Sequence, residues 1–212
     1  KERTDSKVLK EALEIWIRLL APFAPYICEE IWNKIGKEGF VSLAEWPTYD
    51  EKKANPKAEE TESLIESALE DTSNILRATK MVPKKICYYS AAPWKWKLYL
   101  TMLEKAISTK VVLSALMKEL MTDPNLEGKA EKVAKFASQV IEEINRMPDD
   151  KKHRRLEVGV VDESQALKEA ENFFEREFNA KIYIYREDDP QRHDPKKKAA
   201  LAKPYRPAIY ME

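Results

Sequence analysis

Glycine, cysteine and histidine are scarce in this sequence. Four glycines among 212 residues cannot build a glycine-rich phosphate loop. The cysteines, Cys28 and Cys87, form no CxxC pair, and His153 and His193 have no partner at metal-ligand spacing, which argues against a disulfide scaffold, a metal site and a catalytic triad. No apolar run approaches the ~18–20 residues that a membrane span needs. We therefore expect a cytoplasmic protein without metal.

The charges of the chain balance. Its 37 basic and 37 acidic residues give a formal net charge of zero, so no field of the whole molecule attracts a nucleic acid. The 43% apolar content suffices for a globular core, and the shortage of glycine favours helix over sheet. Because the chain opens at Lys1 rather than at a methionine, we expect it to be a fragment of a longer protein.

Apolar periodicity predicts an all-helical first part. A helix is expected over 8–20, a second one ends at Gly36, and a third covers about 59–80. The segment 37–57 between the last two is predicted to be an irregular connector. The apolar stripe of the first helix consists of Leu9, Leu13, Trp16 and Leu20. These helices predict part of an antiparallel bundle.

The pattern changes after Pro83, where stretches rich in β-formers alternate with helical stretches. We expect strands at 85–90, 156–160, 181–186 and 207–211, and helices at about 93–107, 109–122, 129–146, 163–178 and, within a loop, 195–202. The predicted fold class is therefore mainly α with a small β-sheet (α+β). We place the domain boundary near residue 82, between an all-helical part (1–82) and an α+β part (83–212).

Local segregation of charge is hidden behind the net value of zero. Residues 77–110 contain eight basic residues and one acid, and residues 192–206 contain six basic residues and one acid. A shorter basic cluster flanks His153. By contrast, residues 50–71 contain eight acids and three lysines, which we interpret as a solvated acidic helix face. Any affinity for RNA would have to arise in the basic stretches.

Aromatic residues are interleaved with these basic residues, and two hypotheses compete. Cationic side chains can hold RNA phosphates while exposed rings stack on unpaired bases. Alternatively, the lysines form an ordinary solvated surface and the aromatics belong to the core. The aromatics are Tyr88, Tyr89, Trp94, Trp96, Tyr99, Tyr205 and Tyr210. The candidate phosphate contacts are Lys84, Lys85, Lys95, Lys97, Arg154, Arg155, Lys196, Lys197, Lys198, Lys203 and Arg206.

No arrangement typical of catalysis is recognisable. The adjacent acids Glu29 and Glu30 would point about 100° apart on a helix, so they would not converge on one substrate atom. We expect one of them in an ion pair between helices and the other in solvent. The fragment itself is predicted to be non-catalytic.

One long motif is more specific than composition. Residues 19–32, LLAPFAPYICEEIW, and residues 42–47, SLAEWP, resemble the helical anticodon-binding domain shared by the leucyl, isoleucyl, valyl and methionyl tRNA synthetases. Its motif residues here are Pro22, Phe23, Pro25, Glu29, Glu30, Trp32, Trp46 and Pro47. The prolines are expected to bend one helix into the next. Trp46 and Pro47 would close the connector against the bundle, and the residues expected to pack the corner are Phe23, Ile27, Ile31 and Trp32.

The end of the sequence narrows the resemblance. The block 156–212, with AKIYIYRED and DPKKKAALAKPYRPAIYME, is similar to the C-terminal end of archaeal and eukaryotic-type leucyl-tRNA synthetases. That resemblance implies tRNA(Leu) as the partner, contacted at its elbow and long variable arm. The upstream catalytic and editing domains, which use ATP and leucine, would be the other partners. No cofactor, membrane or DNA is implied for this fragment.

The resemblance also implies a role for the last residues. We expect the segment Tyr205–Glu212 to approach the tip of the variable arm, where either an aromatic ring or backbone groups would read a base. The candidate contacts are Tyr205, Ile209, Tyr210, Met211 and Glu212. The alternative function is a helical protein-interaction scaffold that uses the acidic face and the aromatics as an interface and binds no RNA.

Overall fold

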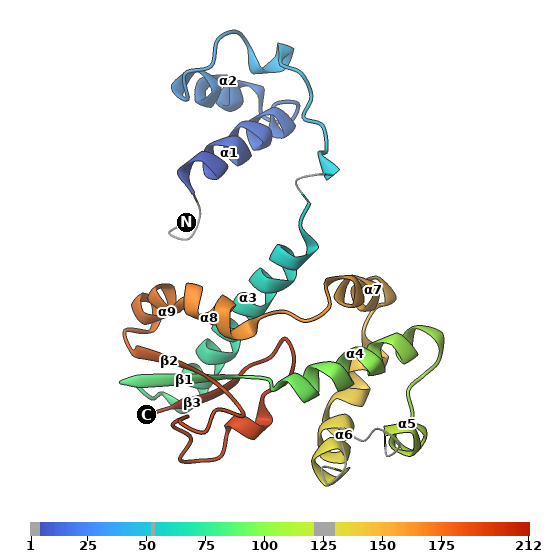
Figure 1. Cartoon of the computed structure of the whole chain (residues 1–212). Helices are drawn as coiled ribbons and strands as arrows, with labels where there is room; N and C mark the ends of the chain where they lie inside the picture. The colour runs from blue at the N-terminus through green and yellow to red at the C-terminus, as the bar shows by residue number, and fades with distance from the viewer. Residues whose placement is uncertain (1–4, 52–53, 121–129) are drawn as a thin grey trace. The chain divides into compact units, whose positions relative to one another are not determined.

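The computed structural model describes residues 5–51, 54–120 and 130–212, and these form two compact units (Figure 1). The first unit extends to Ala54 and the second covers Asn55–Glu212. The described residues are mainly helical with one three-stranded mixed sheet, which confirms the predicted α+β class. The predicted domain boundary near residue 82 stays a prediction, while the compact units divide 28 residues earlier, at Ala54.

The first unit consists of α1 (Ser6–Leu20), α2 (Pro25–Lys34) and the short 3-10 helix η1 (Val41–Leu43). The Asp5 side chain accepts a hydrogen bond from Lys7 N and begins α1, and Pro25 occupies the first turn of α2. Its small core contains Ile17, Ala21, Cys28, Trp32 and Val41. The predicted stripe of α1 is not part of that core, because Leu9, Leu13, Trp16 and Leu20 are 40–68% exposed.

Helix α3 (Pro56–Thr79) belongs to the second unit. The Asn55 side chain caps it by accepting a hydrogen bond from Ala58 N, and Lys80 ends it in the left-handed conformation (φ 54°). Its inner face buries Leu64 and Ile65 against the sheet. The acids of the 50–71 stretch that lie on α3 therefore belong to a helix anchored on the sheet.

The sheet has the order β2-β1-β3. Its central strand β1 (Lys85–Ser90) pairs in parallel with β2 (Lys181–Arg186) and antiparallel with β3 (Ala208–Met211). The predicted strands at 85–90, 181–186 and 207–211 are confirmed. Strand alternation places Ile86 and Tyr88 on one face of the sheet and Cys87 and Tyr89 on the other.

The two faces of the sheet are covered differently. Helices α3, α8 (Glu163–Glu169) and α9 (Glu171–Phe178) cover the face of Ile86 and Tyr88 (Figure 1). The other face, which we call the open face, is covered in part by residues 187–207, the covering loop, whose Ala199 and Ala202 pack on Cys87 and Tyr89. This loop contains the short helix η4 (Ala199–Leu201), within the predicted 195–202. The predicted single helix 163–178 is divided at Ala170.

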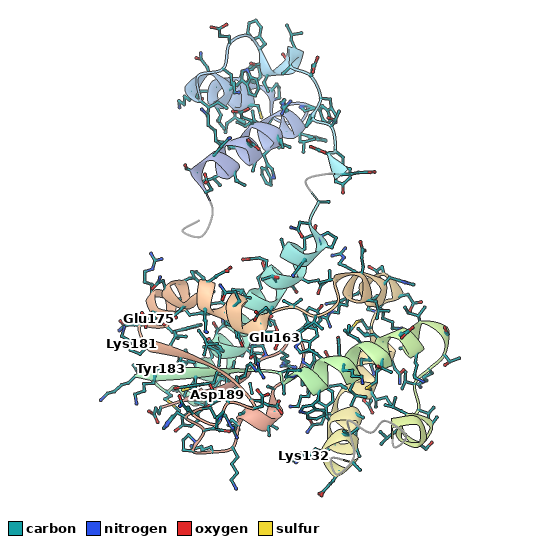
Figure 2. All side chains as sticks on the ribbon, in the orientation of Figure 1. Lys132, Glu163, Glu175, Lys181, Tyr183 and Asp189 are labelled. Carbon is teal, nitrogen blue, oxygen red and sulfur yellow. The ribbon has the colours of Figure 1, made fainter. Side chains whose placement is uncertain are left out.

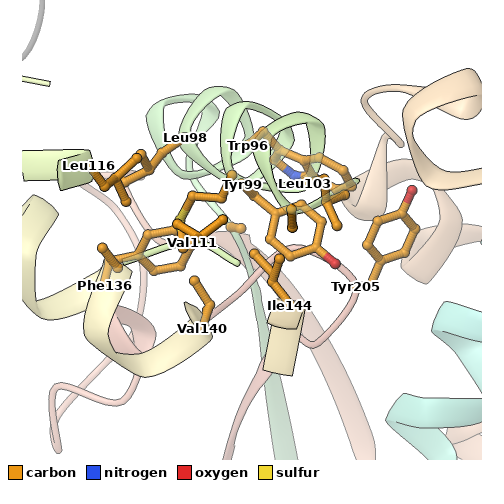
Figure 3. Close-up of a cluster of buried hydrophobic side chains, with 14 of the residues drawn as sticks. Trp96, Leu98, Tyr99, Leu103, Val111, Leu116, Phe136, Val140, Ile144 and Tyr205 are labelled. Atoms are coloured by element: carbon orange, nitrogen blue, oxygen red, sulfur yellow. The ribbon is translucent and has the colours of Figure 1, made fainter. Parts of the chain in front are cut away.

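The remaining helices form a second core beside the sheet (Figure 3). They are α4 (Pro93–Ser108), α5 (Leu113–Leu120), α6 (Ala130–Arg146) and α7 (Asp149–Val158). The first three confirm the helices predicted at 93–107, 109–122 and 129–146, of which residues 121–122 and 129 lie outside the described residues. The core labelled in Figure 3 contains Trp96, Leu98, Tyr99, Leu103, Val111, Leu116, Phe136, Val140, Ile144 and Tyr205.

Helix α7 corrects one prediction. The strand expected at 156–160 is the end of this helix, which Gly159 terminates at φ 67°. The inner face of α7 consists of Lys152, Arg155 and Leu156, spaced as on a helix, but two of these are charged. The apolar pattern of a helix was therefore hidden, and the alternation of Leu156 with two valines imitated a strand.

Replacing Tyr88 by phenylalanine is expected to lower the free energy of unfolding by about 0.5–1.5 kcal/mol, the net value of one hydrogen bond. The Tyr88 hydroxyl is fully buried and lies 2.7 Å from Thr72 Oγ1 on α3. Thr72 keeps its hydrogen bond to Ala68 O, so the decrease stays modest. Urea unfolding of both proteins measures the difference, and no decrease at all would show that this bond contributes nothing to the packing of α3 on β1.

Candidate nucleic-acid interface

Three exposed lysines stand on the covering loop. Lys196, Lys197 and Lys198 are all exposed, and Lys197 has a left-handed backbone (φ 53°). The Asp194 carboxylate fixes this turn by accepting hydrogen bonds from the backbone N–H groups of Lys198 (2.7 Å) and Ala199 (3.1 Å). The hydroxyl of Tyr89 donates to His193 O from beneath the loop. The lysines therefore extend from an ordered turn on the open face.

Lys84 and Lys85 lie where β1 begins, close to the last residue of the chain. The carbonyl of Glu212 accepts from the backbone N–H groups of both lysines, and Lys85 Nζ lies 2.7 Å from Glu212 Oε1. His193 Nε2 lies 3.3 Å from the other carboxylate oxygen. The Lys85 contact, first among several, lowers the pKa of Glu212 to about 2. The exposed lysines here are thus accompanied by one carboxylate. Lys97 is exposed on α4.

Lys95 does not belong to this surface. Its side chain is 3% exposed, and its Nζ donates to the carbonyl oxygens of Ala200 (2.9 Å) and Ala202 (2.6 Å). A carboxylate oxygen of Glu187 lies 2.5 Å away. Burial lowers the pKa of Lys95, while the Glu187 carboxylate acts in the opposite direction. Lys95 fastens the covering loop to α4, and we remove it from the predicted phosphate contacts.

Arg155 and Tyr205 are also internal. Arg155 pairs with buried Glu60 of α3 (3.3 Å), donates to the Tyr99 hydroxyl and lies 3.9 Å above the centre of the Tyr205 ring. Tyr205 is 5% exposed. The RNA contacts predicted for Arg155 and Tyr205 are therefore corrected, because the buried guanidinium group and the buried ring are not accessible to a nucleotide.

The acidic helix α3 holds two further predicted contacts. Arg154 pairs with Glu59 at 3.3 Å, and Arg206 forms two hydrogen bonds with Asp71, at 2.8 and 3.0 Å. Lys203 donates to Gln139 O on α6. An RNA phosphate would have to replace these partners, so these side chains are weaker candidates than the lysines of the loop.

Most of the interleaved aromatics belong to the core. The alternative hypothesis, that these aromatics belong to the core, holds for four residues that are at most 3% exposed: Tyr88, Tyr89, Trp96 and Tyr99. On β3, Tyr210 and Met211 are 9% and 8% exposed and Ile209 is half-buried. Of the two expected modes of contact with a variable-arm tip, the buried rings leave the strand backbone, together with the exposed Glu212 side chain.

The motif residues of the first unit have mixed roles. The Glu29 carboxylate accepts hydrogen bonds from the N–H groups of Val41 and Ser42. Partial desolvation, the largest single effect, acts to raise the pKa of Glu29, but the hydrogen bonds together lower it below its ordinary value. Glu30 pairs with Lys34 on the same exposed helix surface. The expected ion pair between helices is replaced by a carboxylate that closes the connector onto α2.

The packing predicted around that motif is partly corrected. Trp32 is 8% exposed as expected, but Phe23 is 85% and Trp46 is 58% exposed. Pro22 is exposed and Pro47 is half-buried. The corner and the connector therefore leave rings uncovered within the described part of this unit.

Two functional candidates were missed by the sequence reasoning. Tyr183 on β2 is 40% exposed on the open face, beside Lys181. Buried Glu163 accepts hydrogen bonds from Ala91 N (2.8 Å) and Tyr205 N (2.7 Å), and burial raises its pKa to about 7. Figure 2 shows Glu163 inside the second unit and Tyr183 and Lys181 at the sheet. The alternation along KIYIYR could have indicated that Tyr183 lies on one face of the strand. No sequence pattern indicated that Glu163 is buried.

Within the described residues, no group of three or more His, Cys, Asp or Glu side chains is arranged to hold a metal ion. None of the helices found there is both long and apolar enough to cross a membrane.

Comparison with known proteins agrees with the motif. Residues 1–87 match the family model described as the anticodon-binding domain of tRNA ligase. The whole chain is 39% identical to a leucine–tRNA ligase of Methanococcoides burtonii, and 97% of it is 38% identical to that of Pyrococcus furiosus and 36% identical to that of Pyrococcus abyssi. The chain spans 22% of the first of these relatives and 19% of the other two.

Proposed function

We propose, because this chain is homologous over its full length to the C-terminal fifth of archaeal leucine–tRNA ligases, that it binds tRNA(Leu) as part of such an enzyme. The ATP-dependent attachment of leucine would take place on upstream domains, which would also hold ATP and leucine. The chain would recognise its tRNA by the elbow and the long variable arm. Such recognition uses shape, phosphates and unpaired nucleotides, because the deep, narrow major groove of A-form RNA hides the base edges.

The observation that carries this proposal is the ordered lysine turn. Lys196, Lys197 and Lys198 project from a loop that Asp194 and Lys95 fix in place. A cation held in position loses less conformational freedom when it meets a phosphate than one on a disordered tail. Lys84 and Lys85 add charge at the same sheet.

Exposed apolar side chains of the first unit support the upstream domains as partners. Fourteen large apolar residues of this unit are at least 40% exposed, which exceeds what a small separate domain ordinarily leaves uncovered. They are Val8, Leu9, Leu13, Ile15, Trp16, Leu19, Leu20, Phe23, Tyr26, Ile27, Phe40, Leu43, Trp46 and Tyr49. We propose that preceding helices of the ligase cover them.

Changing Lys196, Lys197 and Lys198 together to alanine is expected to weaken tRNA(Leu) binding and to flatten its salt dependence. For every phosphate that the variant no longer holds, the slope of log K against log salt should fall by about 0.7–0.9. Binding titrations at several salt concentrations measure both quantities. A control variant changes Lys132 and Lys135, both exposed on α6, and should leave the slope unchanged. Lys132 lies apart from the sheet (Figure 2).

A competition titration tests the recognition itself. Intact tRNA(Leu) is compared with the same tRNA carrying a shortened variable arm, and the intact tRNA should bind more tightly. Equal affinities would remove the variable arm from the proposal. Absence of any RNA binding would favour the alternative of a protein-interaction scaffold.

A further inference from the structure

Strand β2 carries an aromatic side chain that the covering loop does not reach. Tyr183 pairs with Cys87 of β1 in the sheet register, and both side chains lie on the open face. Cys87 is 1% exposed beneath the loop, whereas Tyr183 is 40% exposed. The loop therefore covers the centre of this face and leaves its β2 margin accessible.

The accessible ring is the end of a row of three tyrosines. Tyr183 is stacked on Tyr185 with ring centres 6.5 Å apart and planes at 8°, and Tyr185 is stacked on Tyr89 at 6.1 Å and 23°. Tyr89 is fully buried, so the row is anchored from inside. Because its inner neighbours hold it, Tyr183 presents a ring in a restricted orientation at the surface.

Two exposed lysines lie near this ring in the sheet. Lys85 and Lys181 are register partners on β1 and β2, and strand alternation starts both side chains on the side of Tyr183. The Lys181 amine extends past the β2 edge to Glu175 of α9. Their side chains are 48% and 72% exposed, and each has one carboxylate partner, Glu212 for Lys85 and Glu175 for Lys181. The lysines of the loop turn stand on the same face. An aromatic ring among exposed cations fits a nucleotide better than a protein partner, because protein interface cores are depleted of charged residues.

We infer that Tyr183 stacks on an unpaired nucleobase of the bound RNA while Lys85 and Lys181 hold the flanking phosphates. Stacking tolerates any base, since every base has a π-face. The inference rests on the proposed tRNA binding. It adds a contact that recognises an unpaired base, whereas the lysines recognise only phosphate charge. It assigns the stacking role to a side chain of β2, whereas most aromatics of the basic stretches are buried and Trp94 is half-buried against Phe136.

The test compares tRNA(Leu) binding of the full chain with that of Tyr183→Ala, Tyr183→Leu and Tyr183→Phe. Alanine and leucine remove the ring, and leucine preserves apolar bulk on the strand. Both are expected to lower the affinity about 5- to 100-fold, as for removal of one base–aromatic stack. Phenylalanine keeps the ring and should bind within about twofold of the original. The slope against salt should stay the same in all four, because every phosphate contact is kept.

The outcomes separate this inference from the function on which it rests. Salt-dependent binding that is unaffected by Tyr183→Ala and Tyr183→Leu would overturn the stacking contact and leave the proposed function standing. An equal decrease with phenylalanine would also overturn it, by assigning the contact to the hydroxyl. If the unaltered chain bound no tRNA, the proposed function itself would fail. Thermal unfolding of each variant establishes that the proteins compared are folded.

Discussion

Replacing Arg155 by alanine is expected to destabilise the second unit by about 3–5 kcal/mol, the cost of leaving one partner of a buried ion pair alone. The Arg155 and Glu60 side chains are 7% and 5% exposed. Removing the guanidinium would leave the Glu60 carboxylate without its cation and remove the group above the Tyr205 ring. Urea unfolding monitored by tryptophan fluorescence measures the destabilisation.

The chain provides a matched control one residue away. Arg154 pairs with Glu59 at the same N–O distance, 3.3 Å, but these side chains are 50% and 56% exposed. Arg154→Ala should therefore cost at most about 1 kcal/mol, as for a surface ion pair. Similar costs for the two arginines would show that burial does not control the strength of these pairs. The double variant Arg155→Met/Glu60→Leu should be destabilised less than Arg155→Ala, because no buried charge remains unpaired.

Stability is expected to depend on pH through Glu163. The pKa of this carboxyl is raised from its ordinary value of 4.5 to about 7, first by burial, against hydrogen bonds from Ala91 N and Tyr205 N and the nearby charge of Lys95. In the unfolded chain the group ionises near its ordinary pKa. Its contribution is therefore fully present below about pH 4.5 and is lost as pH rises through about 7.

Comparison with Glu163→Gln isolates this contribution. The amide resembles the protonated acid in shape and does not titrate. From pH 5 to pH 8 the free energy of unfolding of the original should fall relative to the variant by about 2–3 kcal/mol. Thermal or urea unfolding across that range measures the difference. A rise in relative stability instead would show that the two backbone hydrogen bonds outweigh the cost of burying the charge.

Local pattern was a good guide wherever each face of an element had a simple composition. Strands 85–90 and 181–186 are β-rich and were predicted at their observed bounds. Helix α7 was missed because Lys152 and Arg155, not apolar residues, form much of its inner face. The partner of Arg155 is Glu60, which lies 95 residues away in sequence. Local helix and strand propensities therefore cannot show that the Arg155 side chain is paired and buried.

The interface was predictable for its loop lysines and not for its aromatics. The local excess of positive charge predicted RNA contacts at Lys196, Lys197 and Lys198, which are exposed. It also predicted a contact at Lys95, but this side chain is bound to carbonyl groups of the covering loop, which folds back on α4. The covering loop decides which tyrosines of the sheet stay accessible. Its irregular sequence has no periodicity, so its path over the sheet could not be predicted.

The arrangement of charge around the sheet affects how an RNA would be met. The acidic helix α3 covers the face of the sheet that carries Ile86 and Tyr88. The lysine turn lies over the opposite face. A unit of this kind has a permanent dipole even where its charges cancel. Near a polyanion it would experience a torque that rotates the lysines forward before any contact forms. Encounters at low ionic strength would then begin in the productive orientation more often, and this advantage would fade once the Debye length falls below about 10 Å.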